Sequence, residues 1–388
     1  MCKIAVIGAG PAGCMVACNL NKDFDITLFD KDLPLKTLLP TGGGKCNLAH
    51  ADYDYRDLAK NYPRGEKFLY SVFSKFGTQE TLDFFKKIGI NTYTRHDNRI
   101  FPVSNSSKEV RNKFLDKLKH CKFLQENVIL LKKFKNGFEL KTNKSSYFFD
   151  VIIVATGGKS GYKILEDLGH SIIEPKPSLV GLKTQPCYKN LQGVTIKNCK
   201  IQCNKKEYFG DILFTNNGIT GPAVFELSSM NARNEFPYKI NVDFINKEIN
   251  LQELFDANPH KNLGNLLSEY LPKSVVNTIF NVDLAQKCHA IRSNTKGLVE
   301  RTLTNYSFEI KGTRNDGEIV TCGGIRLNEI NSKTFESKVF ENLYMCGEVL
   351  DVDGFCGGYN LQFCWSSGFI VATGINASVK FCNNILKN

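Results

Sequence analysis

A glycine-rich turn near the start of the chain constrains the fold more than any other feature of the sequence. Residues 3–7 form a short apolar run that predicts a buried parallel strand, and residues 8–13 follow at once with the pattern G-x-G-x-x-G. A helical pattern over residues 14–21 and a second apolar run over residues 24–29 come next, and Asp30 ends that run. This order of strand, glycine turn, helix, strand and acid predicts a Rossmann-like βαβ unit that binds a dinucleotide.

The residues of this turn have separate tasks. Gly8 permits the tight turn after the strand, Gly10 lets the backbone approach a pyrophosphate, and Gly13 lets the helix pack close to the strand. The pyrophosphate would lie at the helix N-terminus, beside Pro11 and Ala12, where free N–H groups and the helix dipole favour an anion. These five residues are therefore predicted to bind the dinucleotide.

The residues after the second strand extend the predicted site. Asp30 has the spacing expected of the carboxylate that binds a ribose hydroxyl. Lys31 and Lys36, which follow it, are also predicted to contact the dinucleotide. Residues 41–47, T-G-G-G-K-C-N, resemble a phosphate-binding P-loop but lack its first glycine and the Ser or Thr after its lysine. We interpret this segment as backbone lying along a flat ligand. Its predicted contacts are Gly43, Gly44, Lys45, Cys46 and Asn47.

Two later segments are predicted to pass the same ligand. Residues 123–132 predict a strand, and Val128 within it takes the position where such folds usually pass the adenine. Residues 151–154 predict a second buried strand. It leads into three small residues, Ala155, Thr156 and Gly157. Small residues there let the chain cross a bound dinucleotide closely, so these three are also predicted contacts.

The C-terminal part returns to the pattern of the first domain. Residues 342–346 predict a strand, and a double glycine later precedes a helix that runs to about residue 381. FAD-binding folds hold the ribityl chain and the flavin edge with such an element, and the helix dipole would stabilise negative charge on the reduced ring. The predicted contacts here are Gly347, Glu348, Asp353, Gly358, Tyr359, Asn360 and Leu361. No second G-x-G-x-x-G is present, so no separate nicotinamide-nucleotide domain is visible.

These segments predict an α/β protein with a discontinuous Rossmann-like FAD-binding domain, residues 1–178 and 318–388. Short strand-like stretches dominate residues 179–248 and 304–317, which predict a β-rich inserted domain. Residues 249–303 read as a helical subdomain carried by that domain. Within the first domain, apolar spacing predicts one helix over residues 68–88.

Composition excludes several classes of protein. No stretch has the length and apolar character of a membrane span, and the first strand begins too early for a signal peptide, so we expect a cytoplasmic protein without membrane contact. The 14 cysteines include no C-x-x-C pair, which favours reduced thiols and no metal site. The formal charge is +11, but Lys and Arg are scattered among acidic residues, so a nucleic-acid partner is not favoured.

Together these motifs resemble the BaiN-like, aminoacetone-oxidase-type family of FAD-dependent oxidoreductases. The resemblance rests on residues 8–13, 42–47, 99–104, 213–222 and 336–368. It implies FAD as the cofactor and an FAD domain interrupted by a β-rich and a helical domain. Three departures stand out. Lys45 replaces the usual Arg, Asn216 replaces the usual His of a Phe-Thr-His motif, and residues 159–162 shorten a longer family stretch.

Three activities follow from this interpretation. In the first, NAD(P)H docks transiently as a co-substrate, reduces the flavin, and the hydride passes to a small organic substrate. In the second, a flavin oxidase takes hydride from a small amine or aminoketone and passes the electrons to O₂. The third is an RNA-binding or RNA-modifying flavoprotein, suggested by the positive charge. The candidate catalytic residues are Tyr359, Asp353, Cys46 and Asn216, and proton transfer is assigned first to Tyr359 or Asp353.

Overall fold

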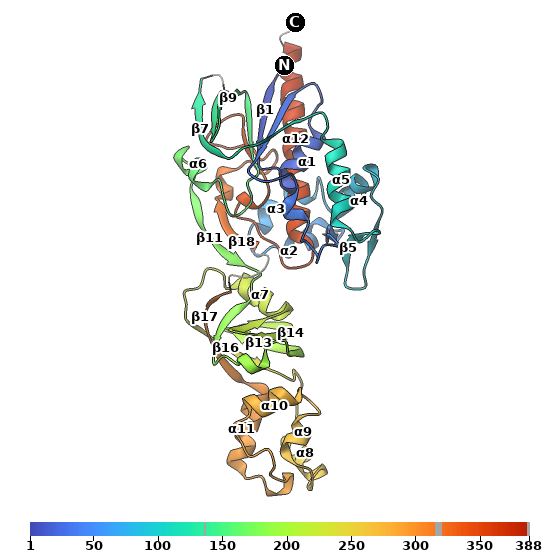
Figure 1. Ribbon diagram of the computed structural model, residues 1–388, viewed down its shortest axis with the longest axis vertical. Helices are drawn as coiled ribbons and strands as arrows, with labels where there is room; N and C mark the ends of the chain where they lie inside the picture. The colour runs from blue at the N-terminus through green and yellow to red at the C-terminus, as the bar shows by residue number, and fades with distance from the viewer. Residues whose placement is uncertain (136, 315–319, 386–388) are drawn as a thin grey trace. The chain divides into compact units, whose positions relative to one another are not determined.

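The computed structural model describes residues 1–135, 137–314 and 320–385 and contains two compact units (Figure 1). Unit 1 consists of Met1–Lys176 and Thr321–Asn388, and unit 2 consists of Pro177–Val320. The chain therefore leaves unit 1 once and returns to it. The domain boundary expected at residues 317 and 318 falls outside the described residues.

Helices and strands are interspersed along the chain in both units. The α-helices are α1 (Pro11–Asn19), α2 (Tyr55–Lys60), α3 (Glu66–Phe73), α4 (Thr78–Lys87), α5 (Ser107–Lys117), α6 (Tyr162–Asp167), α7 (Pro222–Met230), α8 (Leu251–Ala257), α9 (Leu263–Leu267), α10 (Lys273–Ile279), α11 (Ser293–Thr304) and α12 (Tyr359–Ile385). The 3₁₀ turns are η1 (Lys36–Leu38), η2 (Lys189–Leu191), η3 (Cys288–Ala290), η4 (Leu327–Glu329) and η5 (Gly347–Val349).

The strands belong to one parallel sheet, three small sheets and a barrel. They are β1 (Lys3–Ile7), β2 (Asp25–Asp30), β3 (Ala49–His50), β4 (Thr92–Thr94), β5 (Arg99–Pro102), β6 (Lys122–Gln125), β7 (Val128–Phe134), β8 (Gly137–Thr142), β9 (Ser146–Phe149), β10 (Val151–Val154), β11 (Ile172–Ser178), β12 (Leu182–Gln185), β13 (Thr195–Cys203), β14 (Lys206–Thr215), β15 (Gly218–Thr220), β16 (Tyr238–Asp243), β17 (Tyr306–Thr313), β18 (Val320–Ile325) and β19 (Leu343–Met345).

The core of unit 1 is a five-stranded parallel sheet with the order β19-β10-β1-β2-β6. Residues 4–7 of β1 and all of β10 and β19 are continuous buried apolar runs, as expected where both faces of a parallel sheet are covered. The carboxyl ends of the strands share one edge, which is where ligands bind in such sheets. The glycine turn, Ala155 and Cys346 directly follow β1, β10 and β19 at that edge.

Helix α12 brings the end of the chain back against its beginning. It packs along α1, and a Cβ on Gly368 would lie only 2.6 Å from the carbonyl oxygen of Ala12 and 2.9 Å from Cβ of Met15. A Cβ on Gly347, in η5, would lie 2.8 Å from Cβ of Ala12. Small residues thus allow α1, η5 and α12 to converge at the edge where the glycine turn lies.

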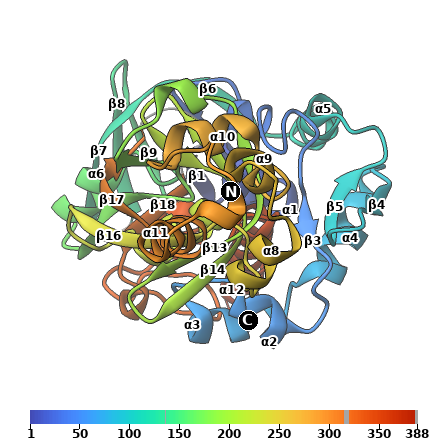
Figure 2. The same ribbon diagram turned by 90° about the horizontal axis from the view of Figure 1, so that it is seen from below.

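Two predictions of secondary structure in unit 1 are wrong. The helix predicted over residues 68–88 is two helices, α3 and α4, because Gly77 has extended backbone and its N–H donates to Glu80 Oε2 at 2.9 Å. The strand predicted over residues 123–132 is divided between β6 and β7, which belong to different sheets. The antiparallel sheet β3-β5-β4 lies beside α4 (Figure 2).

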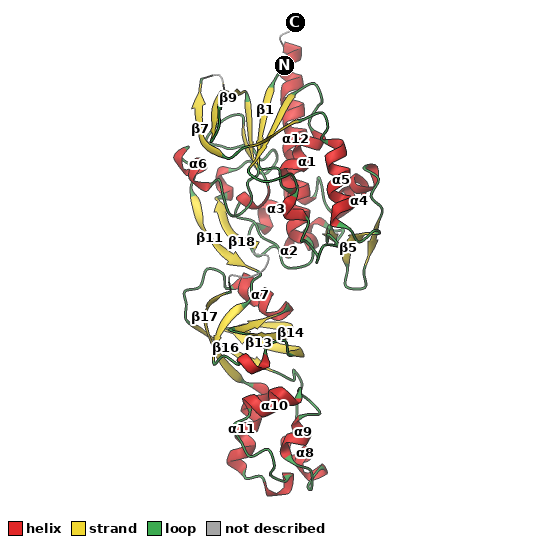
Figure 3. Cartoon of the chain, in the orientation of Figure 1, coloured by secondary structure: helices red, strands yellow, loops and turns green. Residues whose placement is uncertain are grey.

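Unit 2 combines a closed barrel of strands with a group of helices. The barrel order is β12-β15-β14-β13-β16-β17, and α7 packs on β14. Helices α8 to α11 form the helical part (Figure 3) and share one apolar core with the barrel. Among the described residues, no helix combines the length and hydropathy needed to cross a membrane.

Candidate functional site

The glycine turn after β1 packs closely against neighbouring backbone at two of its three glycines. Gly8 has φ +104°, and a Cβ there would lie 2.3 Å from the carbonyl oxygen of Ala155. A Cβ on Gly13 would lie 2.0 Å from the carbonyl oxygen of Gly8. A Cβ on Gly10 would meet only Thr37 Oγ1, at 3.8 Å. The protein itself therefore requires Gly8 and Gly13, whereas Gly10 leaves open space at the N-terminus of α1.

Asp30 is positioned by the same turn. Its Oδ2 accepts a hydrogen bond of 2.8 Å from the backbone N–H of Ala9, and its Oδ1 accepts one of 2.9 Å from Asp32. The carboxylate thus lies against the glycine turn with further lone pairs available. Lys31 is exposed, and Lys36 forms an exposed ion pair with Asp32. Pro11 and Ala12 begin α1, where proline lacks only an N–H that the helix would leave unpaired.

Two buried oxygen atoms in the predicted cofactor-binding segments have no partner among the described residues. They are Thr156 Oγ1, which follows β10, and Asn47 Oδ1, which follows the triple-glycine segment. A buried unpaired polar atom costs about 1–3 kcal/mol. A bound polar ligand would remove that cost, so both atoms fit a cofactor with hydroxyl and amide groups. A Cβ on Gly358 would lie 2.9 Å from Asn47 Oδ1, which places the double glycine beside it.

The triple-glycine segment is a left-handed loop. Gly43 and Gly44 have φ +66° and +84°, and a Cβ on Gly43 would meet nothing within 4 Å. Lys45 is exposed. Cys46 is fully buried in the core of unit 1, and burial raises the pKa of its thiol to about 12. It is therefore a neutral thiol at pH 7, and we assign it no nucleophilic role.

Glu348 lies in η5 beside the small residues that follow β10. Its Oε1 accepts a hydrogen bond of 2.7 Å from the backbone N–H of Thr321. Its Oε2 lies 3.8 Å from the position that a Cβ on Gly157 would take. Burial raises the pKa of Glu348, opposed by backbone N–H groups of Thr321 and Gly158. The carboxylate thus lies beside Gly157.

Asp353 is paired with a residue that the sequence did not indicate. The side chain of Asp353 is fully buried and forms a bidentate ion pair with Arg64, which is 12% exposed. The two residues also form an isolated backbone bridge. This pair joins the segment before α3 to the segment before α12. Arg64 lies outside any recognisable motif, so only the tertiary structure reveals it.

Tyr359 begins α12 and is part of a cluster of polar side chains. Its hydroxyl donates a hydrogen bond of 2.8 Å to Asp52 Oδ2, and its carbonyl oxygen accepts one of 2.6 Å from the Tyr62 hydroxyl. Its ring stacks on His50, with centroids 4.8 Å apart. Burial and the hydrogen bond to Asp52 raise the pKa of Tyr359 well above the ordinary tyrosine value. Tyr359 is consequently a neutral phenol at physiological pH.

The remaining predicted contacts have varied surroundings. Asn360 holds the turn before α12, because its side chain both accepts from and donates to the backbone of Gly354 at 2.9 Å. Leu361 is partly buried against the core of unit 1. Val128 begins β7 and pairs with Thr142 in the sheet β7-β8-β9.

Asn216 is the only predicted site residue that lies in unit 2. Its Oδ1 accepts a hydrogen bond of 3.2 Å from Arg314, which also donates to Asn217 at 2.9 Å. The neighbouring Thr215 Oγ1 is buried without a partner among the described residues. All the other predicted residues belong to unit 1.

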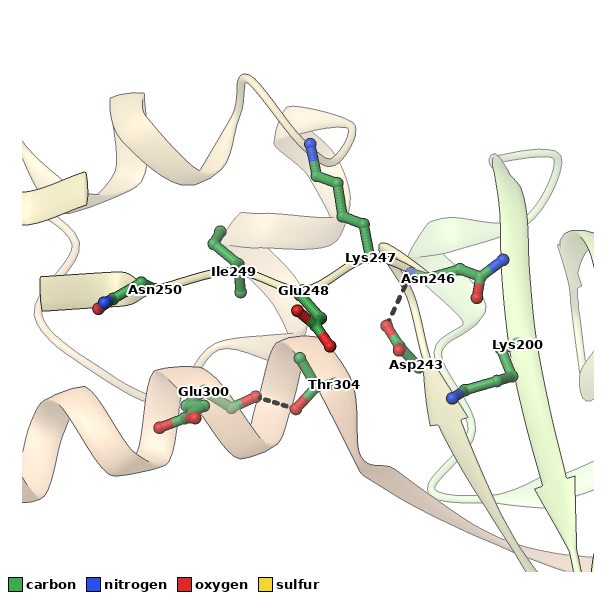
Figure 4. A pocket seen from close by; sticks show the side chains of 9 residues that line it. All are labelled: Lys200, Asp243, Asn246, Lys247, Glu248, Ile249, Asn250, Glu300 and Thr304. Atoms are coloured by element: carbon green, nitrogen blue, oxygen red, sulfur yellow. Dashed lines mark hydrogen bonds between the residues drawn. The ribbon is translucent and has the colours of Figure 1, made fainter. Parts of the chain in front are cut away.

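Unit 2 also has an open hollow beside β16 and α11 (Figure 4). Its lining mixes Lys200 and Lys247 with Asp243, Glu248 and Glu300. Asp243 Oδ1 accepts a hydrogen bond of 2.8 Å from the backbone N–H of Asn246. No predicted site residue lines the hollow, and we assign no ligand to it. In the described part of the chain, no three His, Cys, Asp or Glu side chains come together to hold a metal ion.

Comparison with known proteins identifies the family of the chain. The HI0933-like protein Rossmann domain family matches residues 2–374, and the chain belongs to this family of FAD-dependent oxidoreductases. The resemblance stated from the motifs and the Rossmann-like fold class are therefore confirmed. The family assignment makes the chain an enzyme and supports a flavin as its cofactor.

Relatives with established names cover nearly the whole chain. The ribosomal RNA dihydrouridine synthase of Escherichia coli is 28% identical over 396 residues, covering 96% of this chain and 98% of the relative. The 3-dehydro-bile acid delta(4,6)-reductase of Clostridium scindens is 28% identical, covering 95% and 98%. The Mycobacterium smegmatis Sdh1 complex in the apo form shares the fold, with a TM-score of 0.51, 13% identity, and coverage of 98% of this chain and 69% of that chain.

Proposed function

We propose that the protein is an NAD(P)H-driven, FAD-dependent reductase that saturates a carbon–carbon double bond conjugated with a carbonyl group. The observation that carries this proposal is a shared chemistry in the names of two relatives. Dihydrouridine is uridine with hydrogen added across a ring double bond next to a carbonyl. A Δ4,6-reductase of a 3-dehydro-bile acid likewise saturates double bonds conjugated with a ketone. The substrates differ, but both reactions add hydride and a proton to an activated alkene.

The residues of unit 1 fit FAD, because the open position at Gly10, the unpaired Thr156 Oγ1 and the unpaired Asn47 Oδ1 lie along the edge where FAD is expected. When bound, FAD supplies hydride transfer. We assign the pyrophosphate to the N-terminus of α1 and a ribose hydroxyl to Asp30. The N-terminus of α12, held by Asn360 at Gly354, would stabilise negative charge at the flavin edge.

The experiment that tests the proposal follows the flavin spectrum without oxygen. Purified protein is mixed with NADH or NADPH, and we expect the visible flavin absorbance to bleach. A conjugated enone such as cyclohex-2-enone, or a 3-oxo-Δ4-steroid, is then expected to restore it. If both nucleotides leave the flavin oxidised, the NAD(P)H-driven assignment is wrong. Bleaching by aminoacetone alone, with peroxide formed in air, would instead support the oxidase.

A second candidate substrate is uridine in ribosomal RNA. It is supported by the name of the E. coli relative and by the formal charge of +11. Binding of ribosomal RNA should then weaken steeply with salt, because phosphate contacts release counterions. Incubation with NAD(P)H and ribosomal RNA from a strain that lacks the protein should form dihydrouridine, detectable by mass spectrometry of nucleosides. Binding that is absent at low salt would remove this candidate.

A further inference from the structure

A histidine, an aspartate and a tyrosine form a hydrogen-bonded cluster in unit 1 that the cofactor site does not require. Asp52 Oδ2 lies 3.0 Å from His50 Nδ1 and accepts hydrogen bonds from the Tyr359 hydroxyl at 2.8 Å and from Asn61 Nδ2 at 3.3 Å. One carboxylate oxygen of Asp52 therefore contacts the polar side chains of His50, Asn61 and Tyr359. Thr78 fixes the same segment, because its hydroxyl contacts the carbonyl oxygens of His50 and Asp52 at 3.1 and 2.7 Å.

This arrangement leaves one nitrogen of His50 available. The Asp52 carboxylate beside Nδ1 favours a proton on Nδ1, as an aspartate does in a catalytic triad. His50 Nε2 has no hydrogen-bond partner among the residues that the structure describes. The side chain of His50 is 17% exposed, and its ring is stacked on Tyr359 at an interplanar angle of 27°. The ring is thus held in one orientation with its Nε2 edge free.

The free edge of His50 faces the double glycine that precedes α12. A Cβ on Gly357 would lie 3.4 Å from His50 Cδ2, the ring carbon bonded to Nε2. On the next residue, a Cβ on Gly358 would lie 2.6 Å from the carbonyl oxygen of Ala49 and 2.9 Å from the unpaired Asn47 Oδ1. The cluster therefore borders the part of unit 1 to which we assign the flavin edge.

Arg99 is a cation close to the cluster, and Asp97 is the anion beside it. Arg99 pairs with His50 across the ladder of β3 and β5, and its guanidinium lies 3.9 Å from Cys356 Sγ. Its Nε lies 3.5 Å from Asp97 Oδ2, so the positive charge is partly compensated. Tyr359 keeps its proton because burial and Asp52 raise its pKa.

We infer that His50 is the general acid of the proposed reduction and that Asp52 and Tyr359 are positioning residues that orient it. This inference rests on the proposed function. Hydride is added at the alkene carbon distant from the carbonyl, and His50 in its doubly protonated form transfers its Nε2 proton to the neighbouring carbon. The C=C π bond breaks, two C–H bonds form, and the cofactor is oxidised by two electrons. His50 is left as the neutral ring with its proton on Nδ1, and Nε2 then takes up a proton from solvent.

The kinetic test compares two acceptors for the reduced enzyme. Anaerobic, NAD(P)H-reduced His50→Gln enzyme is mixed either with cyclohex-2-enone or with the dye 2,6-dichlorophenolindophenol, whose reduction protonates no carbon. We expect reoxidation by the enone to slow by about 10²–10⁴-fold and reoxidation by the dye to be unchanged. His120→Gln, at an exposed position, is the matched control and should react with both acceptors as the wild type does.

A spectroscopic test examines the cluster without turnover. With only six histidines in the chain, ring ¹⁵N labelling can resolve His50 by comparison with His50→Gln. We expect the neutral ring to carry its proton on Nδ1 in the wild type. Asp52→Asn should shift the proton toward Nε2, because the amide can donate to the ring. An unchanged tautomer in Asp52→Asn would overturn the positioning role.

The outcomes separate this inference from the proposed function. If the wild-type reduced enzyme reacts with neither the enone nor the steroid, the proposed reductase activity is wrong. If the wild type reacts and His50→Gln reacts equally fast with the enone, the general-acid assignment is wrong and the reductase assignment stands. Equal slowing with enone and dye would show that His50 affects the cofactor and would also overturn the assignment.

Discussion

The hydroxyl of Tyr359 donates a hydrogen bond of 2.8 Å to Oδ2 of Asp52, which joins the first residue of α12 to the segment after β3. The two residues are 307 positions apart in the sequence. The bond ties the C-terminal helix to the loop that follows the triple-glycine segment. The first prediction tests its contribution to stability.

Replacing Tyr359 by Phe removes this bond and is expected to lower the free energy of unfolding by about 1–2 kcal/mol near pH 7. The pKa of Tyr359 is raised in the folded protein, so the folded state keeps a proton that the unfolded state loses above pH of about 10. This contribution to stability is present below that pH and declines as pH rises further. Urea unfolding at pH 8 and pH 11 measures both effects.

The alkaline decline and a control variant check this first prediction. The decline in stability between the two pH values should be smaller in Tyr359→Phe than in the wild type. The control Tyr53→Phe should decline as the wild type does, because Tyr53 is 56% exposed. A Tyr359→Phe variant with the same alkaline decline as the wild type would contradict the prediction.

The second prediction concerns the glycine turn. Gly10→Val should leave the protein folded, because a Cβ there meets only Thr37 Oγ1 at 3.8 Å, but it should block the pyrophosphate and yield colourless protein. Gly13→Val should instead prevent correct folding, because its Cβ would lie 2.0 Å from the carbonyl oxygen of Gly8. Circular dichroism reports the fold and visible absorbance reports bound FAD. Yellow Gly10→Val protein would show that our cofactor position is wrong.

The third prediction uses a buried hydroxyl without a partner. Thr156→Val should leave the free energy of unfolding of the FAD-free protein unchanged or raise it, because no hydrogen bond is lost. It should weaken FAD binding by about 1–2 kcal/mol, which is roughly 5–30-fold in Kd. Fluorescence titration of FAD-free protein measures the binding.

Thr81→Val provides the matched comparison for Thr156→Val. The Thr81 hydroxyl is buried and bonded to the carbonyl oxygen of Gly77 at 2.9 Å and to Gln362 Nε2 at 2.8 Å. Its removal should therefore destabilise the FAD-free protein by about 1–3 kcal/mol. If both variants destabilised the FAD-free protein equally, the Thr156 hydroxyl would have a structural partner and no place in the cofactor site.

The fourth prediction concerns the buried ion pair of Arg64 and Asp353. Arg64→Met should destabilise the protein by about 3–5 kcal/mol, because it leaves a fully buried carboxylate without this cation. The double variant with Asp353→Asn should cost less than the sum of the two single variants. Urea denaturation of the four proteins measures the coupling. Additive effects would mean that the pair contributes no coupling energy.

The candidate cofactor site could be proposed from the sequence because its motifs are local. The tasks of Gly8, Gly10 and Gly13 follow from backbone geometry within one short turn. A Cβ on Gly8 or Gly13 would clash with the backbone, whereas the pyrophosphate contact at Gly10 stays a prediction. The apolar runs that form β1 and β10 predict buried parallel strands for the same local reason. The break between α3 and α4 does not follow from the apolar spacing, which continues across Gly77; the local signal for it is this glycine with a capping glutamate three residues later.

The sequence by itself determined the Rossmann-like unit and the family, since short-range patterns of glycine and apolar residues specify those features. Only the tertiary structure decided that Arg64 neutralises Asp353 and that Asp52 brings His50 to Tyr359. Such pairs join residues separated by hundreds of positions, and their energies come from burial and hydrogen bonding between segments. Neither quantity is encoded in the spacing of neighbouring residues, so no local pattern could reveal them.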